Sequence, residues 1–224
     1  GLAVAHSVAN FFPASGDLHL GLNTLNRLFE KIIYGKLPTG QEWLDHLDIL
    51  NTVRLSSFGS LRKLQDYYSD VLCGYIDVGI EKDSESYASA IKILQDNNLS
   101  IELLVEHNLN SDYVRIPVAN RAHIKDLSFQ RTVVNEGAEV LIPVPLSPEQ
   151  SLAIESVYDL YSNDNTIKQQ NIKLFMDEWN QRENLRTLIN WWDNIPTLLT
   201  ITSVGKVLAH SNAQRCDNSL PSLD

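Results

Sequence analysis

The feature that most constrains this chain is a change in the spacing of its apolar residues near residue 99. Before that point apolar residues recur every three or four positions, as they do on one face of a helix; Leu18, Leu22, Leu25 and Phe29 are an example. In residues 100–106 apolar and polar positions alternate instead, which is typical of a half-buried strand. The sequence therefore predicts an all-helical subdomain over residues 1–98 and a mixed α+β subdomain over residues 99–224.

Four helices are expected in the first subdomain. The second of them opens with Thr39-Gly40-Gln41-Glu42, which fits a capping box, and the third carries Gly59 and Gly74, which weaken a helix. The expected helices cover residues 17–32, 39–50, 57–76 and 84–96. This half of the chain should contain no sheet.

The second subdomain should combine helices with a small sheet of about three strands. Strands are expected at residues 100–106, 139–146 and 197–201, and the second belongs at a sheet edge because Pro143 and Pro145 have no amide proton to donate. Residues 120–136 favour a helix, Ser147-Pro148 opens another, two helices follow up to Trp192, and Thr202 caps the last. A predominantly helical α+β fold is the prediction, with the three strands in one sheet.

Charge and composition limit the function classes. The chain of 224 residues has 28 acidic and 18 basic residues and a net charge of −10, which disfavours nucleic acid and anionic lipid as partners. Its two cysteines form no cluster, so a reducing, cytoplasmic location is expected. No apolar run reaches the roughly 18 residues of a membrane span, and an anchor upstream of Gly1 is left open. No phosphate-binding glycine motif is present, and no cofactor is expected.

Two acidic clusters could carry chemistry on helices. Glu42, Asp45 and His46 share one helix face and could bind a metal ion, although no second Glu-x-x-His pair exists to complete a site. The alternative is a solvated face with acids that favour the helix dipole. A second acidic stripe lies at Asp66, Asp70 and Asp77. It is interpreted as a solvated face, with acid–base chemistry as the alternative.

A third cluster, Glu102, Glu106 and His107, follows the first expected strand. Functional groups often lie beyond the carboxyl end of a strand, so these residues are the candidate catalytic carboxylates and histidine. Turn chemistry explains the same residues without any catalytic role.

Three tryptophans within fourteen residues form the candidate partner surface: Trp179, Trp191 and Trp192. Tryptophan is enriched at binding hot spots, and adjacent tryptophans point to different faces of a helix. One of the pair should lie in the core and the other, Trp191, should be partly exposed.

The segment from Ile201 to Ala209 resembles the strand-to-helix element that closes winged-helix regulators. A similar ending occurs in uncharacterised bacterial helical proteins, including some linked to abortive infection. The resemblance implies a winged-helix-like C-terminal unit and a bacterial origin. However, too few residues lie between Trp192 and Thr197 for a two-stranded wing. The preceding helix offers only Arg182 and Arg186 to phosphates, which favours protein docking over DNA binding.

The leading hypothesis is a non-enzymatic interaction or regulatory module that binds a protein partner or self-associates. Its surface would include the tryptophan-bearing helices and the proline-bearing edge strand. Two alternatives are an enzyme that uses Glu102, Glu106 and His107, and a winged-helix nucleic-acid binder.

Overall fold

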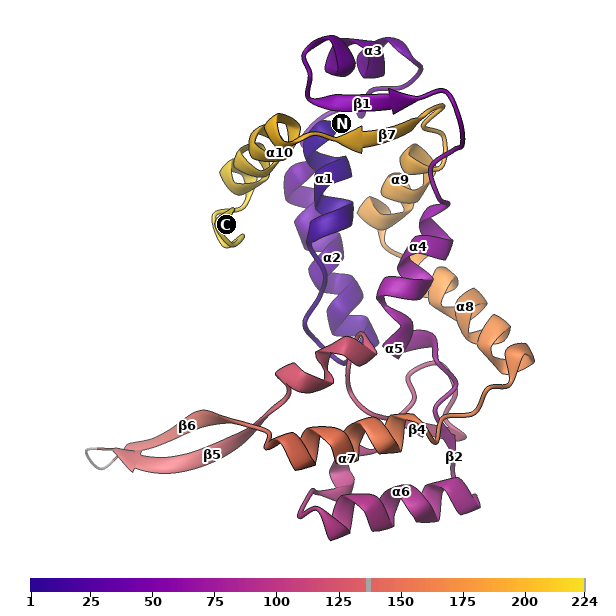
Figure 1. The fold of residues 1–224 in the computed structure, drawn as a ribbon, viewed down its shortest axis with the longest axis vertical. Coiled ribbons are helices and arrows are strands. Elements are labelled where there is room, and N and C mark those ends of the chain that lie inside the picture. Colours follow the sequence, from indigo (N-terminus) through magenta and orange to yellow (C-terminus); the bar gives the residue numbers. More distant parts are fainter. Residues whose placement is uncertain (136–137, 224) are drawn as a thin grey trace. The chain divides into compact units, whose positions relative to one another are not determined.

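The computed structural model describes residues 1–135 and 138–223. The fold is α+β and predominantly helical, as predicted. The chain forms two compact units (Figure 1). Unit 1 comprises residues 1–13, 19–70 and 176–224, and unit 2 comprises residues 14–18 and 71–175.

Unit 1 is built from helices and one two-stranded sheet. Strands β1 (Val53–Ser56) and β7 (Leu198–Ile201) pair antiparallel, with Val53 opposite Ile201. Helix α1 packs against α10. The helices of this unit are α1 (Leu2–Asn10), α2 (Leu18–Ile32), α3 (Glu42–Ile49), α4 (Leu64–Val71), α9 (Glu183–Trp192), α10 (Ser203–Cys216) and the end of α8 (Asn165–Asn180).

The junction of β7 and α10 has the predicted local structure. The Thr202 hydroxyl caps α10 by accepting a hydrogen bond from the Gly205 amide at 3.1 Å. The Thr202 amide donates to the Thr52 carbonyl at 3.0 Å. A Cβ atom on Gly205 would lie 1.9 Å from that same carbonyl oxygen, so the close approach of α10 requires glycine.

Unit 2 has its own core beneath a three-stranded antiparallel sheet of order β2-β4-β3. Helix α7 starts at the predicted capping box, in which Ser147 and Gln150 satisfy each other's amides. The unit contains α5 (Cys73–Ile76), β2 (Ile80–Glu81), α6 (Glu85–Asp96), η1 (Ile101–Leu103), β3 (Val105–Glu106), β4 (Tyr113–Arg115), η2 (Arg121–Asp126), β5 (Ser128–Asn135), β6 (Ala138–Pro145), α7 (Pro148–Tyr158) and most of α8.

The strands do not join into the single sheet that was predicted. They form three separate sheets, because β1 pairs with β7, β4 lies between β2 and β3, and β5 pairs only with β6 among the described residues. Residues 1–98 also contain β1 and β2, so that segment is not all-helical. The two units differ from the predicted division at residue 99, since β1 takes its partner from the C-terminal part of the chain.

Several local predictions were wrong. The expected helix over residues 57–76 is broken into α4 and α5, and Gly59 has a φ of 89°, which no helix allows. The capping box at Thr39 does not form, since Gln41 is the N-cap of α3. Of the expected strand at residues 100–106, only Val105–Glu106 is a strand, β3, and Ile101–Leu103 form the short helix η1. The single helix expected over residues 120–136 is replaced by the short 3-10 helix η2 and by β5, and Glu136 lies outside the described residues.

Candidate functional site

The structure does not bring Glu102, Glu106 and His107 into one site. Glu102 is exposed in η1. The Glu106 carboxylate is exposed in β3 and accepts a hydrogen bond from Lys82 Nζ at 2.8 Å. His107 is buried. The two carboxylates therefore lie in solvent, whereas the histidine ring lies in the interior of unit 2.

His107 is held as a neutral ring by two hydrogen bonds. Its Nδ1 accepts from the Leu109 amide at 3.1 Å, which leaves Nε2 to donate to the Asp77 carbonyl at 2.9 Å. Burial, assisted by the positive charge of Arg115, lowers the pKa of His107 to about 4. This histidine fixes the chain between β3 and β4, as the turn interpretation of the sequence expected.

The candidate metal ligands on α3 do not converge. Glu42, Asp45 and His46 are exposed, and Asp45 accepts a hydrogen bond from Gln41 Nε2 at 2.8 Å. Within residues 1–135 and 138–223, no three His, Cys, Asp or Glu side chains are grouped as metal ligands would be. The solvated-face interpretation describes these three residues.

The three tryptophans are packing residues of unit 1. Trp179 is buried against Tyr68, with ring centroids 4.7 Å apart. Trp191 is only 7% exposed and its Nε1 donates to the Pro38 carbonyl at 2.8 Å, so the expectation that Trp191 is the exposed member was wrong. Trp192 is half-buried and donates to the Arg62 carbonyl. Helix α9 turns Trp191 inward because its apolar stripe also includes Leu185 and Leu188, which are buried.

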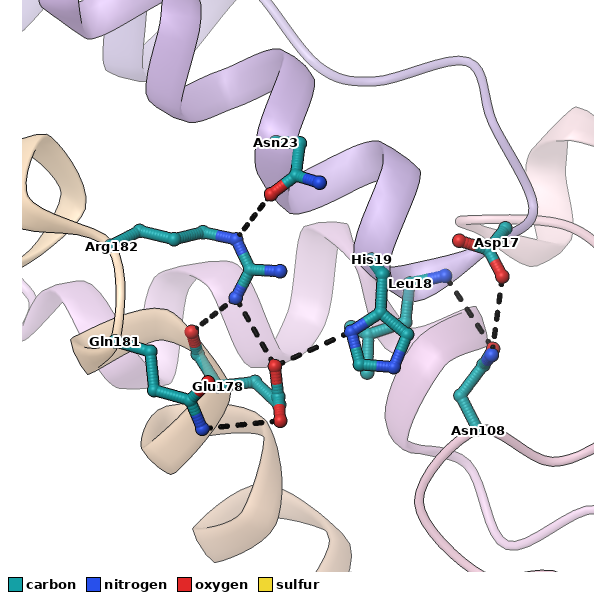
Figure 2. Close-up of polar contacts among 8 residues, drawn as sticks. All are labelled: Asp17, Leu18, His19, Asn23, Asn108, Glu178, Gln181 and Arg182. Carbon is teal, nitrogen blue, oxygen red and sulfur yellow. Dashed lines mark hydrogen bonds and ion pairs between the residues drawn. The ribbon is translucent and has the colours of Figure 1, made fainter.

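Arg182, one of the two candidate phosphate ligands, is committed to other contacts within unit 1. Its Nε donates to Asn23 Oδ1 at 2.8 Å, and its Nη1 lies 3.2 Å from Glu178 Oε2 (Figure 2). The same carboxylate oxygen lies 3.3 Å from His19 Nδ1. Because the Arg182 side chain is only 12% exposed, it offers little to a phosphate backbone.

Asn108, in unit 2, holds the segment that enters helix α2. Figure 2 shows its side-chain amide between Asp17 and the start of the helix. The nitrogen donates to Asp17 Oδ2 at 3.2 Å, and the oxygen lies 3.5 Å from the Leu18 amide nitrogen. These contacts are structural.

A polar pocket in unit 2, which the sequence did not predict, surrounds Asp77. It has a volume of about 480 Å³. Asp77 accepts hydrogen bonds from the Tyr158 hydroxyl at 2.6 Å and from Lys168 Nζ at 2.8 Å. Arg121 lies 2.6 Å from Asp159 and stacks over the Tyr158 ring. Each charged group here already has a partner of opposite charge.

The neighbouring thiol gives this pocket little reactivity. Burial raises the pKa of the Cys73 thiol, which keeps the sulfur protonated and a weak nucleophile. Asp77 was assigned to a solvated stripe because it lies at helical spacing from Asp70. It escaped recognition because Tyr158 and Lys168, its partners, lie far along the sequence.

The most distinctive surface feature is the hairpin formed by β5 and β6. Its two eight-residue strands pair from Ser128 opposite Pro145 to Asn135 opposite Ala138. Figure 1 shows the strands side by side, extending away from α7 of the same unit. Phe129, at the start of β5, packs against the core of unit 2. Further along, three consecutive residues of β6 are exposed: Val140 by 43%, Leu141 by 63% and Ile142 by 38%.

Consecutive exposed apolar residues in a strand mean that both faces of the hairpin carry apolar surface, because successive side chains point to opposite faces. Pairs of isolated strands are marginal in water. The predicted strand with Pro143 and Pro145 is confirmed as β6, and its partner strand is the segment for which a helix was expected.

Comparisons with known proteins gave no match: no family model, no curated protein and no solved structure corresponds to this chain. Among the residues that the structure describes, no helix combines the length and apolarity needed to cross a membrane.

Proposed function

We propose that the protein is a non-enzymatic interaction module that binds a protein partner through the β5–β6 hairpin. The observation that carries the proposal is the run Val140, Leu141 and Ile142, in which every side chain is exposed although the strand is paired on one side only. Exposed apolar strands with open edges are avoided in proteins unless they bind something.

The placement of the predicted site residues supports an interaction role over catalysis. Glu106 is paired with Lys82, the His107 ring is buried and hydrogen-bonded on both nitrogens, and the acids of the Asp77 pocket are paired with bases. Trp179 and Trp191 are buried and Trp192 is half-buried. Of the two surfaces expected from the sequence, we therefore assign the partner surface to the edge strand alone.

A second apolar surface lies on α10 and serves as the competing candidate. Val204, Val207 and Leu208 are each about half exposed and share one helix face. This is the helix that the resemblance to winged-helix units presents as a docking element. The experiment must therefore separate the hairpin from α10.

The free thiols of Cys73 and Cys216 support a reducing location. A cytoplasmic site is accordingly part of the proposal, and a bacterial origin is proposed with it on the resemblance of the segment from Ile201 to Ala209 alone.

Affinity purification from the source organism with two variants tests this function. In the first, residues 130–143 are replaced by Asn-Gly, which removes the outer hairpin, closes it on the hydrogen-bonded Phe129–Val144 pair and keeps Phe129 in the core. In the second, Val207→Lys charges the α10 surface. We expect the wild type and Val207→Lys to retain the same proteins, with further copies of the chain counted among them, and the shortened hairpin to lose them. Unchanged thermal unfolding confirms that each variant folds. Loss from Val207→Lys alone would move the function to α10, and equal retention by all three proteins contradicts a role of the hairpin.

A further inference from the structure

We infer that the partner bound by the hairpin is a second copy of this chain, joined through the outer edge of β5 in each copy. This inference rests on the proposed function, and it specifies the partner and the edge. The choice of edge depends on which strand of the hairpin has backbone amides that are free to pair with a further strand, because prolines have none.

The prolines show which backbone groups point outward. Pro143 pairs with Gln130 and Pro145 with Ser128. Proline has no amide proton, so in a two-stranded sheet it belongs where the nitrogen faces away from the partner strand. Backbone groups of alternate residues point to the same side of a strand, and both prolines therefore lie on the outward side of β6. The directly opposite residues of β5 also point outward.

The two edges of the hairpin consequently differ. On β6, the outward positions are Glu139, Leu141, Pro143 and Pro145, and the two prolines have no donor. On β5, the outward positions include Gln130, Thr132 and Val134. None of them is proline, so each has both an amide donor and a carbonyl acceptor. A further strand can therefore pair along the whole of β5, whereas on β6 the two prolines interrupt such pairing.

Two copies of β5 can pair with each other around a two-fold axis. In an antiparallel arrangement centred on Thr132, each Thr132 exchanges both backbone hydrogen bonds with its counterpart, and Gln130 lies opposite Val134. The product is a four-stranded sheet of order β6-β5-β5-β6 with proline-bearing strands at both ends. Such an assembly closes at two copies and does not grow into a fibre.

The charge of the hairpin fits a neutral, self-complementary contact. Although the chain carries a net charge of −10, only two of the sixteen strand positions are charged, Arg131 and Glu139. Interface cores are depleted of charged residues in the same way. A strongly basic or acidic partner would find no complementary charge here, while an identical strand supplies matching backbone groups.

A pair of proline variants tests the edge directly. Thr132 and Leu141 lie opposite each other in the hairpin and both point outward, so proline at either position removes no bond between β5 and β6. Thr132→Pro removes one donor per copy from the proposed contact, and Leu141→Pro changes only the edge of β6. By sedimentation equilibrium we expect a wild-type dimer of twice 25.3 kDa. For Thr132→Pro we expect the dissociation constant of the dimer to rise at least about tenfold, because two hydrogen bonds are lost. For Leu141→Pro we expect the same dissociation constant as for the wild type.

A crosslinking variant keeps the test decisive if a proline disturbs folding. Cα atoms of a hydrogen-bonded antiparallel pair are about 5.5 Å apart, which suits a disulfide. In a background in which Cys73 and Cys216 are replaced by serine, Thr132→Cys should form a covalent dimer on mild oxidation and Leu141→Cys should not.

The outcomes separate the two proposals. A wild type that stays at 25.3 kDa up to about 100 µM, a hundred times a micromolar dissociation constant, overturns the second-copy inference. If the shortened hairpin still loses captured proteins in that case, the proposed function stands with another partner. A dimer weakened equally by both prolines, or crosslinked equally through both cysteines, contradicts the β5 edge.

Discussion

Arg115 and His107 are buried in unit 2, and both stabilise the fold although arginine and histidine are common in active sites. Arg115 is 1% exposed and donates to the carbonyls of Gly74 at 2.8 Å and Val118 at 3.1 Å. The same guanidinium reaches the Gly16 carbonyl. His107 fixes the adjacent segment through the Asp77 carbonyl. Both are therefore expected to affect stability rather than a reaction.

Replacing Arg115 with methionine should lower the free energy of unfolding by about 3 kcal/mol or more. The change leaves several buried carbonyls without a donor, and each unsatisfied group costs about 1 to 3 kcal/mol. Urea denaturation measures the loss. The control is Arg121→Met, which removes a half-exposed pair with Asp159 and should cost less than about 1 kcal/mol. Equal effects of the two variants would show that Arg115 does not hold these loops.

His107 should make the protein less stable in mild acid. Its pKa is about 4 in the folded state against 6.5 for a free histidine, so the unfolded chain binds the proton more tightly. Stability that is fully present above pH 6.5 is lost as the pH falls toward 4, by about 3 kcal/mol at pH 4. Denaturation midpoints between pH 7 and 4 should show a weaker pH dependence in His107→Gln than in the wild type. The exposed His46→Gln variant is the control, and an unchanged slope in His107→Gln contradicts the assignment.

At the scale of elements, helices were easier to predict than strands. Helices α2, α6, α7, α8, α9 and α10 were expected within a few residues, because their apolar spacing and caps are local. The capping box of α7 is an example. Strand β5 was missed because Ile124, Leu127 and Val134 fall on one face of a helix, whereas its strand character depends on pairing with β6.

Helix α10 depends on glycine for its position against β1. Gly205→Ala would place a Cβ atom 1.9 Å from the Thr52 carbonyl oxygen. Alanine favours a helix by about 1 kcal/mol, but displacing the backbone should cost more, and a net loss of about 1 to 2 kcal/mol is expected. Gly35→Ala, where no atom lies within 4 Å of the added Cβ, is the control. A Gly205→Ala protein as stable as Gly35→Ala would mean that α10 shifts without cost. Thermal unfolding compares the two.

At the scale of the whole molecule, successive segments of the chain belong alternately to unit 1 and unit 2, and the first and last segments belong to unit 1. The sequence predicted the fold class but not this organisation, since no local pattern records that β1 pairs with β7. The candidate site had the same limits. The edge strand β6 was expected because proline is a local signal, while the burial of Trp191 and the pairing of Asp77 with Lys168 depend on distant residues.

Residue-resolved amide hydrogen exchange tests most directly whether the hairpin binds its partner through the outer edge of β5. In dilute protein, amides that face β6, such as Phe129 and Val133, should be protected, while the outward amides of Gln130, Thr132 and Val134 exchange freely. In concentrated, associated protein the outward amides should become protected as well. If they stay unprotected while the protein associates, or are already protected in the dilute monomer, the β5 edge is not the binding surface.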